Sequence, residues 1–265
     1  MISQKKLVDL EKFLFKGKKY KEAIPFPYCF VDDLWDSDLL KAAEKDINEF
    51  KNWDGEKDFY GAVGKRFCNT FDKLPESVKN ILYVCNSPRF IRCLEEITGD
   101  EGLIPDPYFE GGGIHSTINR GFLKMHTDFN WYSKLKLYRR LNLIIYLNSN
   151  WKKEWKGNLK LGLKNKNNIK IFSEISPIFN RSILFTTTNK TYHGHPESLE
   201  APDGKSRNSI AIYYYVSKRP KGGSLLKRTG TIYRKIDDGK KFVGELRIKN
   251  LPRKIKSLIK IIFQK

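Results

Sequence analysis

Hydrophobic residues recur at helical spacing in three segments of the first hundred residues. Polar or turn-forming residues precede each segment: Asp36 or Ser37, Pro75 and Ser87 are suited to begin a helix, and Gly99 is suited to end the third. The pattern therefore predicts three amphipathic helices that pack on a common core. Their apolar positions are Leu40, Ala43, Ile47 and Phe50; Val78, Ile81, Leu82 and Cys85; and Phe90, Leu94 and Ile97.

From about residue 103 the pattern changes to short β-rich runs separated by Gly, Asn, Lys and Pro. Closely spaced strands without intervening helices predict an antiparallel sandwich or barrel. Residues 143–147 and 210–216 are apolar on both faces, as expected if one face packs against a second sheet and the other against the helices. The predicted strands cover residues 121–130, 141–148, 159–163, 169–172, 182–188 and 209–216.

Composition excludes several classes of protein. With 40% hydrophobic residues in 265, the chain can bury a sizeable core and is not disordered throughout. No apolar run approaches the ~20 residues of a membrane span, and residues 1–6 lack the apolar stretch of a secretory signal, so we expect a cytoplasmic protein. The four cysteines lack a CxxC pairing and histidine partners at zinc-ligand spacing, which favours buried free thiols.

The formal net charge of +20 is concentrated in the last part of the chain. Residues 218–265 hold 16 Lys+Arg and 3 Asp+Glu, a net of +13, which leaves +7 for residues 1–217. Apolar residues at helical spacing between Leu251 and Ile262, with basic residues between them, predict an amphipathic helix in a basic C-terminal extension, residues 221–265. This helix could lie at an anionic membrane surface, which would make the protein peripheral there, bind RNA phosphates, or dock on the main domain with its lysines in solvent.

Two of the four histidines fit a metal site. His126 and Asp128 form a His-x-Asp pair on a strand-like segment, where residues i and i+2 project to the same face. A third ligand would come from a strand distant in sequence, and His193 after the 182–188 strand fits that role. Two histidines and one carboxylate on one side of an iron leave three positions open, enough for a bidentate co-substrate and dioxygen. Zinc is less favoured because nothing marks a base for hydrolysis.

A second element points to a dicarboxylic co-substrate. Arg207 begins the last strong strand, and Ser209 lies two residues on, on the same face. An arginine can hold a carboxylate with two parallel hydrogen bonds, and the serine can add a third.

Each assignment has an alternative. A His-x-Asp pair alone is more often a surface hydrogen bond than a metal site, and His195 competes with His193 because both project to the same side of an extended segment. His115 is more typical of a packed, hydrogen-bonded histidine than of a ligand, although it could line a pocket. Arg139 and Arg140 could reach a negative substrate, be solvated, or form a buried structural pair.

Taken together, these motifs resemble the 2-oxoglutarate and Fe(II)-dependent oxygenases, and within them the bacterial prolyl-4-hydroxylase-like group, from about residue 25 to residue 220. The resemblance implies a mainly β fold with supporting helices, a double-stranded β-helix (jelly roll, cupin-like) core behind an N-terminal helical layer. The Tyr-His-Gly register favours His193 over His195. The stretches that carry it are 87–90, 111–115, 121–130, 139–148, 179–181, 192–196 and 207–215.

The same resemblance implies the cofactors and the roles of the residues. Iron would be held by His126, Asp128 and His193, and 2-oxoglutarate by Arg207 with Ser209 assisting. Dioxygen would be the second co-substrate, with ascorbate as a candidate reductant.

The expected organisation is an oxygenase domain over residues 1–220, with helical support in about 1–102 and the β-helix core in about 103–217, followed by the basic extension. The expected activity is hydroxylation of an unactivated C–H bond, prolyl-hydroxylase-like. A sugar, glycan or small metabolite would use the same site, so the prime substrate and the oligomeric state stay open. The rival from another class is a non-catalytic cupin-like module that binds RNA or membrane through its basic tail.

Overall fold

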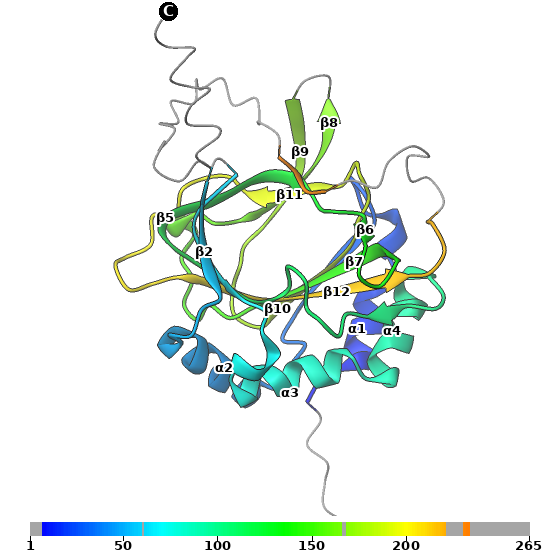
Figure 1. Cartoon of the computed structure of the whole chain (residues 1–265), viewed down its shortest axis with the longest axis horizontal. Coiled ribbons are helices and arrows are strands. Elements are labelled where there is room, and N and C mark those ends of the chain that lie inside the picture. Colours follow the sequence, from blue (N-terminus) through cyan, green and yellow to red (C-terminus); the bar gives the residue numbers. More distant parts are fainter. Residues whose placement is uncertain (1–6, 60, 166–167, 221–229, 234–265) are drawn as a thin grey trace, which may run out of the picture.

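The computed structural model describes residues 7–59, 61–165, 168–220 and 230–233. Its centre is a curled antiparallel sheet in the jelly-roll arrangement, which confirms the predicted fold class. Figure 1 shows the strands arranged around a central space, with the helices along one side. The strands are β1 (Tyr28–Asp32), β2 (Gly55–Phe59), β3 (Ala62–Cys68), β4 (Ile104–Pro105), β5 (Gly113–Thr127), β6 (Trp131–Tyr132), β7 (Leu137–Tyr146), β8 (Leu159–Asn165), β9 (Asn168–Ile175), β10 (Arg181–Thr186), β11 (Tyr192–His195), β12 (Arg207–Val216) and β13 (Ile232–Tyr233).

The long strand β5 belongs to both walls of the jelly roll. Its first part pairs with β12, which continues through β7 to β10, and its last part pairs with β11, which continues through β8 to β9. The hairpin of β2 and β3 adds to the other edge of β5. A residue on β5 can therefore meet side chains from both walls.

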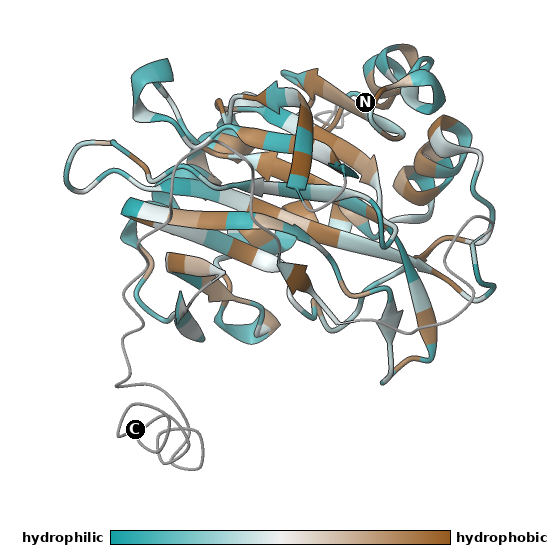
Figure 2. Cartoon of the chain, turned by 90° about the horizontal axis from the view of Figure 1, so that it is seen from above, coloured by the Kyte–Doolittle hydropathy of each residue, from teal (hydrophilic) through white to brown (hydrophobic). Residues whose placement is uncertain are grey.

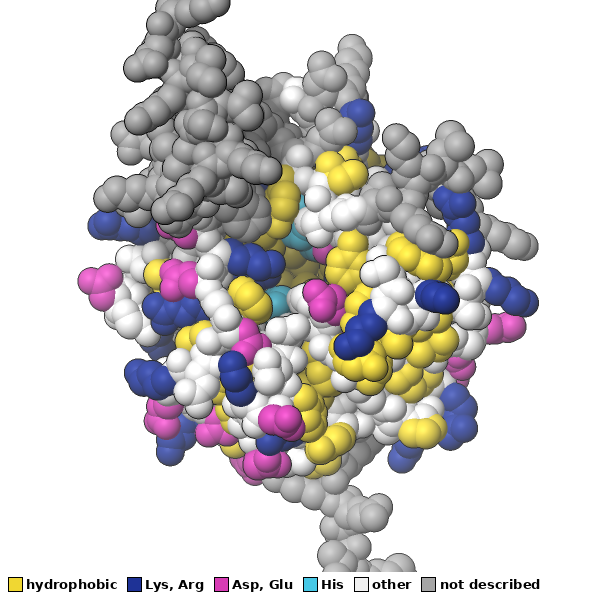
Figure 3. All heavy atoms as spheres, in the orientation of Figure 1, with side chains coloured by type: hydrophobic (Ala, Val, Ile, Leu, Met, Phe, Trp, Pro, Cys, Tyr) yellow, Lys and Arg dark blue, Asp and Glu magenta, His cyan; other side chains and the backbone are white. Residues whose placement is uncertain are grey.

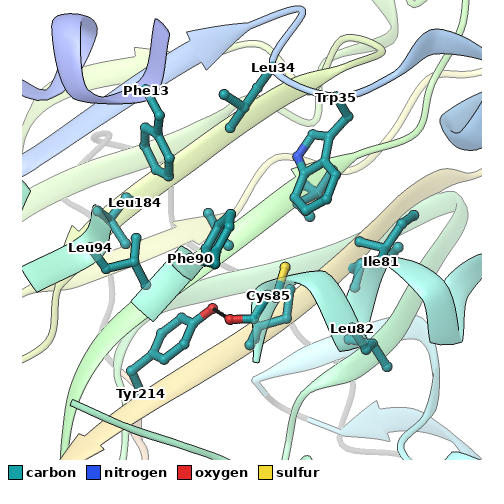
Figure 4. Close-up of a cluster of buried hydrophobic side chains, with 14 of the residues drawn as sticks. Phe13, Leu34, Trp35, Ile81, Leu82, Cys85, Phe90, Leu94, Leu184 and Tyr214 are labelled. Carbon is teal, nitrogen blue, oxygen red and sulfur yellow. Dashed lines mark hydrogen bonds between the residues drawn. The ribbon is translucent and has the colours of Figure 1, made fainter. Parts of the chain in front are cut away.

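The helices form a layer against the outer face of β7, β10 and β12. They are α1 (Leu10–Gly17), α2 (Ser37–Glu49), α3 (Glu76–Cys85) and α4 (Pro88–Thr98), and short 3₁₀ turns lie at Tyr20–Glu22, Phe71–Lys73 and Lys153–Trp155. The main core lies between this layer and the sheet. In Figure 4, Phe90 lies at its centre, with ring centroids 6.0 Å from Phe13 and 6.0 Å from Trp35, and the hydroxyl of Tyr214 donates to the carbonyl of Cys85.

The three predicted helices are present, and their termini are as the sequence indicates. Asp36 caps α2 by accepting from the backbone N–H of Leu39, and Ser87 caps α4 by accepting from that of Phe90. Gly99 ends α4 at a φ of 69°, a left-handed conformation that costs a glycine little. These caps fix where the helices start and stop beneath the sheet.

The prediction that β7 and β12 are buried on both faces is also confirmed. On β7, Leu143 and Ile145 face the helical layer, whereas Tyr146 packs inside the jelly roll with Leu161 and Phe185. Figure 2 shows hydrophobic residues concentrated on strands and helices and hydrophilic ones in the projecting loops. Strands covered on both sides hold their inward side chains in fixed positions.

Two features of the first hundred residues were not predicted. The helix α1 lies before the first predicted helix, and β2 and β3 join the sheet, so this region is not a helical layer alone. The β2–β3 hairpin escapes prediction because it is rich in charged residues and carries little apolar alternation.

Beyond residue 220, the structure describes only residues 230–233, in which β13 pairs with the end of β5. The predicted basic helix around residues 251–262 lies outside the described residues. In the described part of the chain, no helix has the length and apolarity needed to cross a membrane. All four cysteines are buried free thiols, as expected.

Replacing Phe90 with alanine should lower the free energy of unfolding by about 3–5 kcal/mol, because the cavity left between α4 and the sheet cannot close fully. Chemical denaturation measures the effect. Phe15→Ala is the matched control, since this ring is 64% exposed and its removal should change the free energy by less than about 0.5 kcal/mol. Equal effects of the two substitutions would contradict the assigned core.

Candidate active site

Three side chains converge where β5 and β11 pair. His126 lies near the end of β5, Asp128 follows just after the strand, and His193 is the direct cross-strand partner of His126. One potential ligand atom from each lies within 4.8 Å of the other two. The carboxylate oxygens of Asp128 are 3.6 Å from Nε2 of His126 and 3.3 Å from Nε2 of His193. The ladder therefore brings together three residues that lie up to 67 positions apart in the sequence.

The protonation states suit a metal ion. Nδ1 of His126 is 2.8 Å from the carbonyl of Lys124, so the ring donates there and leaves the Nε2 lone pair toward Asp128. Burial lowers the pKa of His126 to about 3 and also lowers that of His193. Burial alone would raise the pKa of Asp128, but Arg139 and the two histidines outweigh it and hold that pKa well below its ordinary value. Two neutral imidazoles and a carboxylate are the donor set that a non-haem Fe(II) site requires.

A buried hydrogen-bond network holds the Asp128 carboxylate in place. Oδ2 accepts from Nη2 of Arg139 at 2.9 Å and from Nδ2 of Asn142 at 2.8 Å. Arg139 also donates to Oδ1 of Asn142, through Nε at 3.0 Å and Nη2 at 2.7 Å, and its guanidinium lies 3.4 Å from the ring centre of Tyr213. In the described part of the chain Oδ1 of Asp128 accepts no hydrogen bond, which leaves it for a ligand.

The two arginines left open by the sequence thus have different places. Arg139 is buried against Asp128 inside the jelly roll. Arg140 points to the other face of β7, where its Nε donates to Asp100 at 2.8 Å.

Arg207 and Ser209 lie on the inner face of β12, as expected from their spacing. Nε of Arg207 donates to the carbonyl of Gly157 at 2.7 Å, and Nη2 donates to the hydroxyl of Tyr146 at 3.1 Å. Nη1 has no hydrogen-bond partner among the described residues. Because burial raises the pKa of Tyr146, its phenol keeps a proton that it can donate to an anion. Arg207, Tyr146 and Ser209 together can hold a carboxylate.

Tyr146 was missed by sequence reasoning. It belongs to a strand that the sequence predicts, but its role depends on the β7–β12 register, which places it directly across from Ser209. No local motif specifies that pairing.

The remaining histidines line the same cavity without joining the metal-binding group. His195 is buried, and its Nδ1 has no hydrogen-bond partner in the described residues. Burial lowers its pKa well below the ordinary value, and that of His115 as well. Between the two candidates for the third position, the structure places His193, and not His195, beside His126 and Asp128.

These side chains surround a cavity with an empty volume of about 870 Å³, its open mouth included. Figure 3 shows the hollow, with histidine and hydrophobic side chains in its wall and both basic and acidic side chains at its rim. Two contributors come from outside the predicted core: the β2–β3 hairpin supplies Lys57 and Lys65, and β13 supplies Tyr233, whose ring centroid is 5.3 Å from that of His126. The hydrophobic wall includes Leu123, Phe129, Ile144, Leu159, Ala211 and Tyr213.

Comparison with known proteins agrees with this geometry. Residues 113–215, from the start of β5 almost to the end of β12, match the model of the 2OG-Fe(II) oxygenase superfamily. The matched segment contains every candidate ligand and co-substrate residue described above, from His126 to Ser209. The match supports a 2-oxoglutarate-dependent dioxygenase, with Fe(II) as the cofactor and 2-oxoglutarate as the co-substrate. No curated protein matches the sequence.

Solved structures of other oxygenases share the fold. A prolyl-4-hydroxylase from Pseudomonas putida is 12% identical, with a TM-score of 0.52, covering 76% of this chain and 97% of its own. A prolyl hydroxylase from Trichoplax adhaerens, solved with a hypoxia inducible factor peptide, is 16% identical with the same TM-score, covering 78% and 90%. HygX from Streptomyces hygroscopicus, solved with nickel, 2-oxoglutarate and hygromycin B, is 10% identical with a TM-score of 0.50, covering 86% and 96%. At these identities the likeness concerns the fold.

The hydrogen bond from Asn142 to Asp128 predicts that Asn142 positions the candidate metal-binding carboxylate. Asn142→Leu removes one of the two donors to Oδ2 of Asp128, and should weaken binding of Co(II), a redox-stable substitute for Fe(II), by about 10- to 100-fold. Titration of the metal-free protein measures the affinity. Asn165→Leu, the same change at an exposed position at the end of β8, should leave it unaltered. Unaltered affinity in Asn142→Leu would show that Arg139 alone suffices.

Proposed function

We propose that this oxygenase hydroxylates an unactivated C–H bond of its substrate, with His126, Asp128 and His193 as the Fe(II) ligands. The observation that supports this assignment best is the donor set itself. Two buried neutral imidazoles present Nε2, and an ionised carboxylate presents its unbonded Oδ1, to one shared space. Bound Fe(II), with dioxygen, supplies the oxidising chemistry in which 2-oxoglutarate becomes succinate and carbon dioxide while one oxygen atom enters the substrate.

The chain's own residues supply orientation and a shielded site. Arg207, Tyr146 and Ser209 would hold the distal carboxylate of 2-oxoglutarate and so fix the co-substrate in the cavity that it shares with the three candidate ligands. Arg139 and Asn142 hold Asp128 so that only one oxygen is available to the metal. The hydrophobic wall excludes water from the reacting centre.

The structure has a complete metal-donor set, and Arg207, Tyr146 and Ser209 can hold a carboxylate. Both features favour a catalytic enzyme over a module that only binds its partner. A prolyl substrate remains the suggestion of the prolyl-4-hydroxylase-like resemblance, and a sugar, glycan or small metabolite would meet the same iron. The oxidant is common to all of these, so the substrate must be distinguished by the cavity wall.

Purified protein with Fe(II) and 2-oxoglutarate should release succinate slowly even without its substrate. Asp128→Ala should abolish this release, because it removes one metal ligand and leaves Arg139 without its anionic partner. Chromatography of succinate after a timed incubation measures it. Asp203→Ala, a change of the same kind at an exposed carboxylate, is the control and should retain the rate. An undiminished rate in Asp128→Ala would refute the metal assignment.

Arg207→Lys should raise the KM for 2-oxoglutarate about 10-fold or more, because an ammonium group cannot reproduce the planar pair of donors. Initial rates of succinate formation over a range of 2-oxoglutarate concentrations measure the KM. Arg181→Lys is a matched control, because Arg181 makes a two-point contact with Asp32 at 2.6 and 2.7 Å, outside the cavity. A KM within twofold of the unmodified protein's would remove Arg207 from the co-substrate site.

A further inference from the structure

A row of basic side chains crosses the inner face of the sheet beside the active site. Lys57 on β2 pairs with Lys65 on β3, Lys65 pairs with Thr117 on β5, and Thr117 pairs with Arg207 on β12. Cross-strand partners project to the same face of a sheet, and all four residues line the cavity. The row therefore runs from Arg207, in the proposed 2-oxoglutarate site, outward to the β2–β3 hairpin.

Within the described part of the chain, the two lysines have no anionic partner in hydrogen-bond or ion-pair contact. Among the described residues, Nζ of Lys65 makes no hydrogen bond or ion pair, and Nζ of Lys57 lies 5.2 Å from the ring centre of Phe67. The neighbouring cross-strand pair of the hairpin, Glu56 and Arg66, does form an ion pair, at 3.4 Å, and both of its side chains are well exposed. Burial, and then the charge of Lys57, lower the pKa of Lys65 to about 7.

The other charges of the cavity are already matched. Arg139 is paired with Asp128, which is the only carboxylate among the described residues that line the cavity. In the proposed function, the distal carboxylate of 2-oxoglutarate pairs with Arg207. Lys57 and Lys65 thus stay uncompensated when the co-substrate is bound. Like charges directly opposite each other destabilise a sheet, and more so where water is displaced, so this arrangement favours an anion between them.

We propose that Lys57 and Lys65 bind an anionic group, a carboxylate or a phosphate, of the substrate that this enzyme oxidises. The proposal rests on the proposed function and adds a substrate class to it. Arg207 lies two strands from Lys65, about 10 Å at the usual strand spacing, so the two anion sites are separate. The hydrophobic wall of the cavity, which includes Phe129 and Tyr213, would contact the apolar part of the substrate.

NMR signals from the lysine side chains can test this proposal directly. The protein is reductively methylated with ¹³C, which keeps each lysine charged, then loaded with Zn(II) and saturating 2-oxoglutarate, and its methyl signals are recorded by NMR. Loss of a signal in Lys65→Arg or Lys57→Arg assigns it. Inorganic phosphate and acetate are the anionic probes, acetamide is the neutral one, and sodium chloride holds ionic strength constant. Binding of 2-oxoglutarate is measured first and separately, so its failure would count against the proposed function alone.

The signals of Lys57 and Lys65 should shift saturably with phosphate or acetate, and the stronger probe indicates which group the substrate carries. Acetamide should cause no shift, and exposed Lys190 should respond to neither anion. In Lys57→Gln the probe affinity reported by Lys65 should fall about 10-fold, the usual loss for one hydrogen bond to a charged group. Parallel shifts of Lys190 and Lys65 would overturn the proposal. A Lys65 signal that responds to 2-oxoglutarate but not to the later probes would also overturn it, by placing Lys65 in the co-substrate site.

Discussion

The buried carboxylate of Asp128 is the interaction on which the rest of the site depends. An ionised carboxylate away from water is costly unless it is paired and hydrogen-bonded, and here Arg139 and Asn142 supply both. Because that pairing uses Oδ2, the second oxygen stays available beside two imidazoles that burial keeps neutral. The ion pair thus stabilises the negative charge and leaves Oδ1 as the carboxylate atom that could bind a metal.

Such a network needs a rigid frame, and the two-sided burial of the strands provides it. The inner faces of β7 and β12 carry Asn142, Tyr146 and Arg207, while their outer faces pack against the helical layer. A shift of either strand would disturb the helical core and the cavity together. This coupling explains why helices that carry no chemistry still matter for the geometry of the site.

The sequence alone indicated most of the candidate site residues, but not the strand pairing that brings them together. Residues two positions apart on a strand share a face, so the sequence was sufficient to predict that His126 lies beside Asp128 and Arg207 beside Ser209. The pairing of His193 with His126, and of Tyr146 with Ser209, depends on long-range ladders that no local pattern specifies. The β2–β3 hairpin was missed for a related reason: its charged residues look solvent-exposed in sequence, yet Lys57 and Lys65 face inward once the hairpin joins β5.

This last point changes what the excess of positive charge says about function. Most of the +20 lies in residues 218–265, nearly all of which are outside the described residues. Two of the 50 basic residues, Lys57 and Lys65, lie in the cavity near Arg207 without an anionic partner among the described residues, and their position constrains the substrate more than the total charge does. Water and salt screen charges at the surface, so their interactions there are short-ranged. In a cavity lined by Phe129 and Tyr213 the screening is weaker, and the same charges act over a longer distance. The register of one hairpin therefore carries information about the substrate that the composition of the whole chain does not.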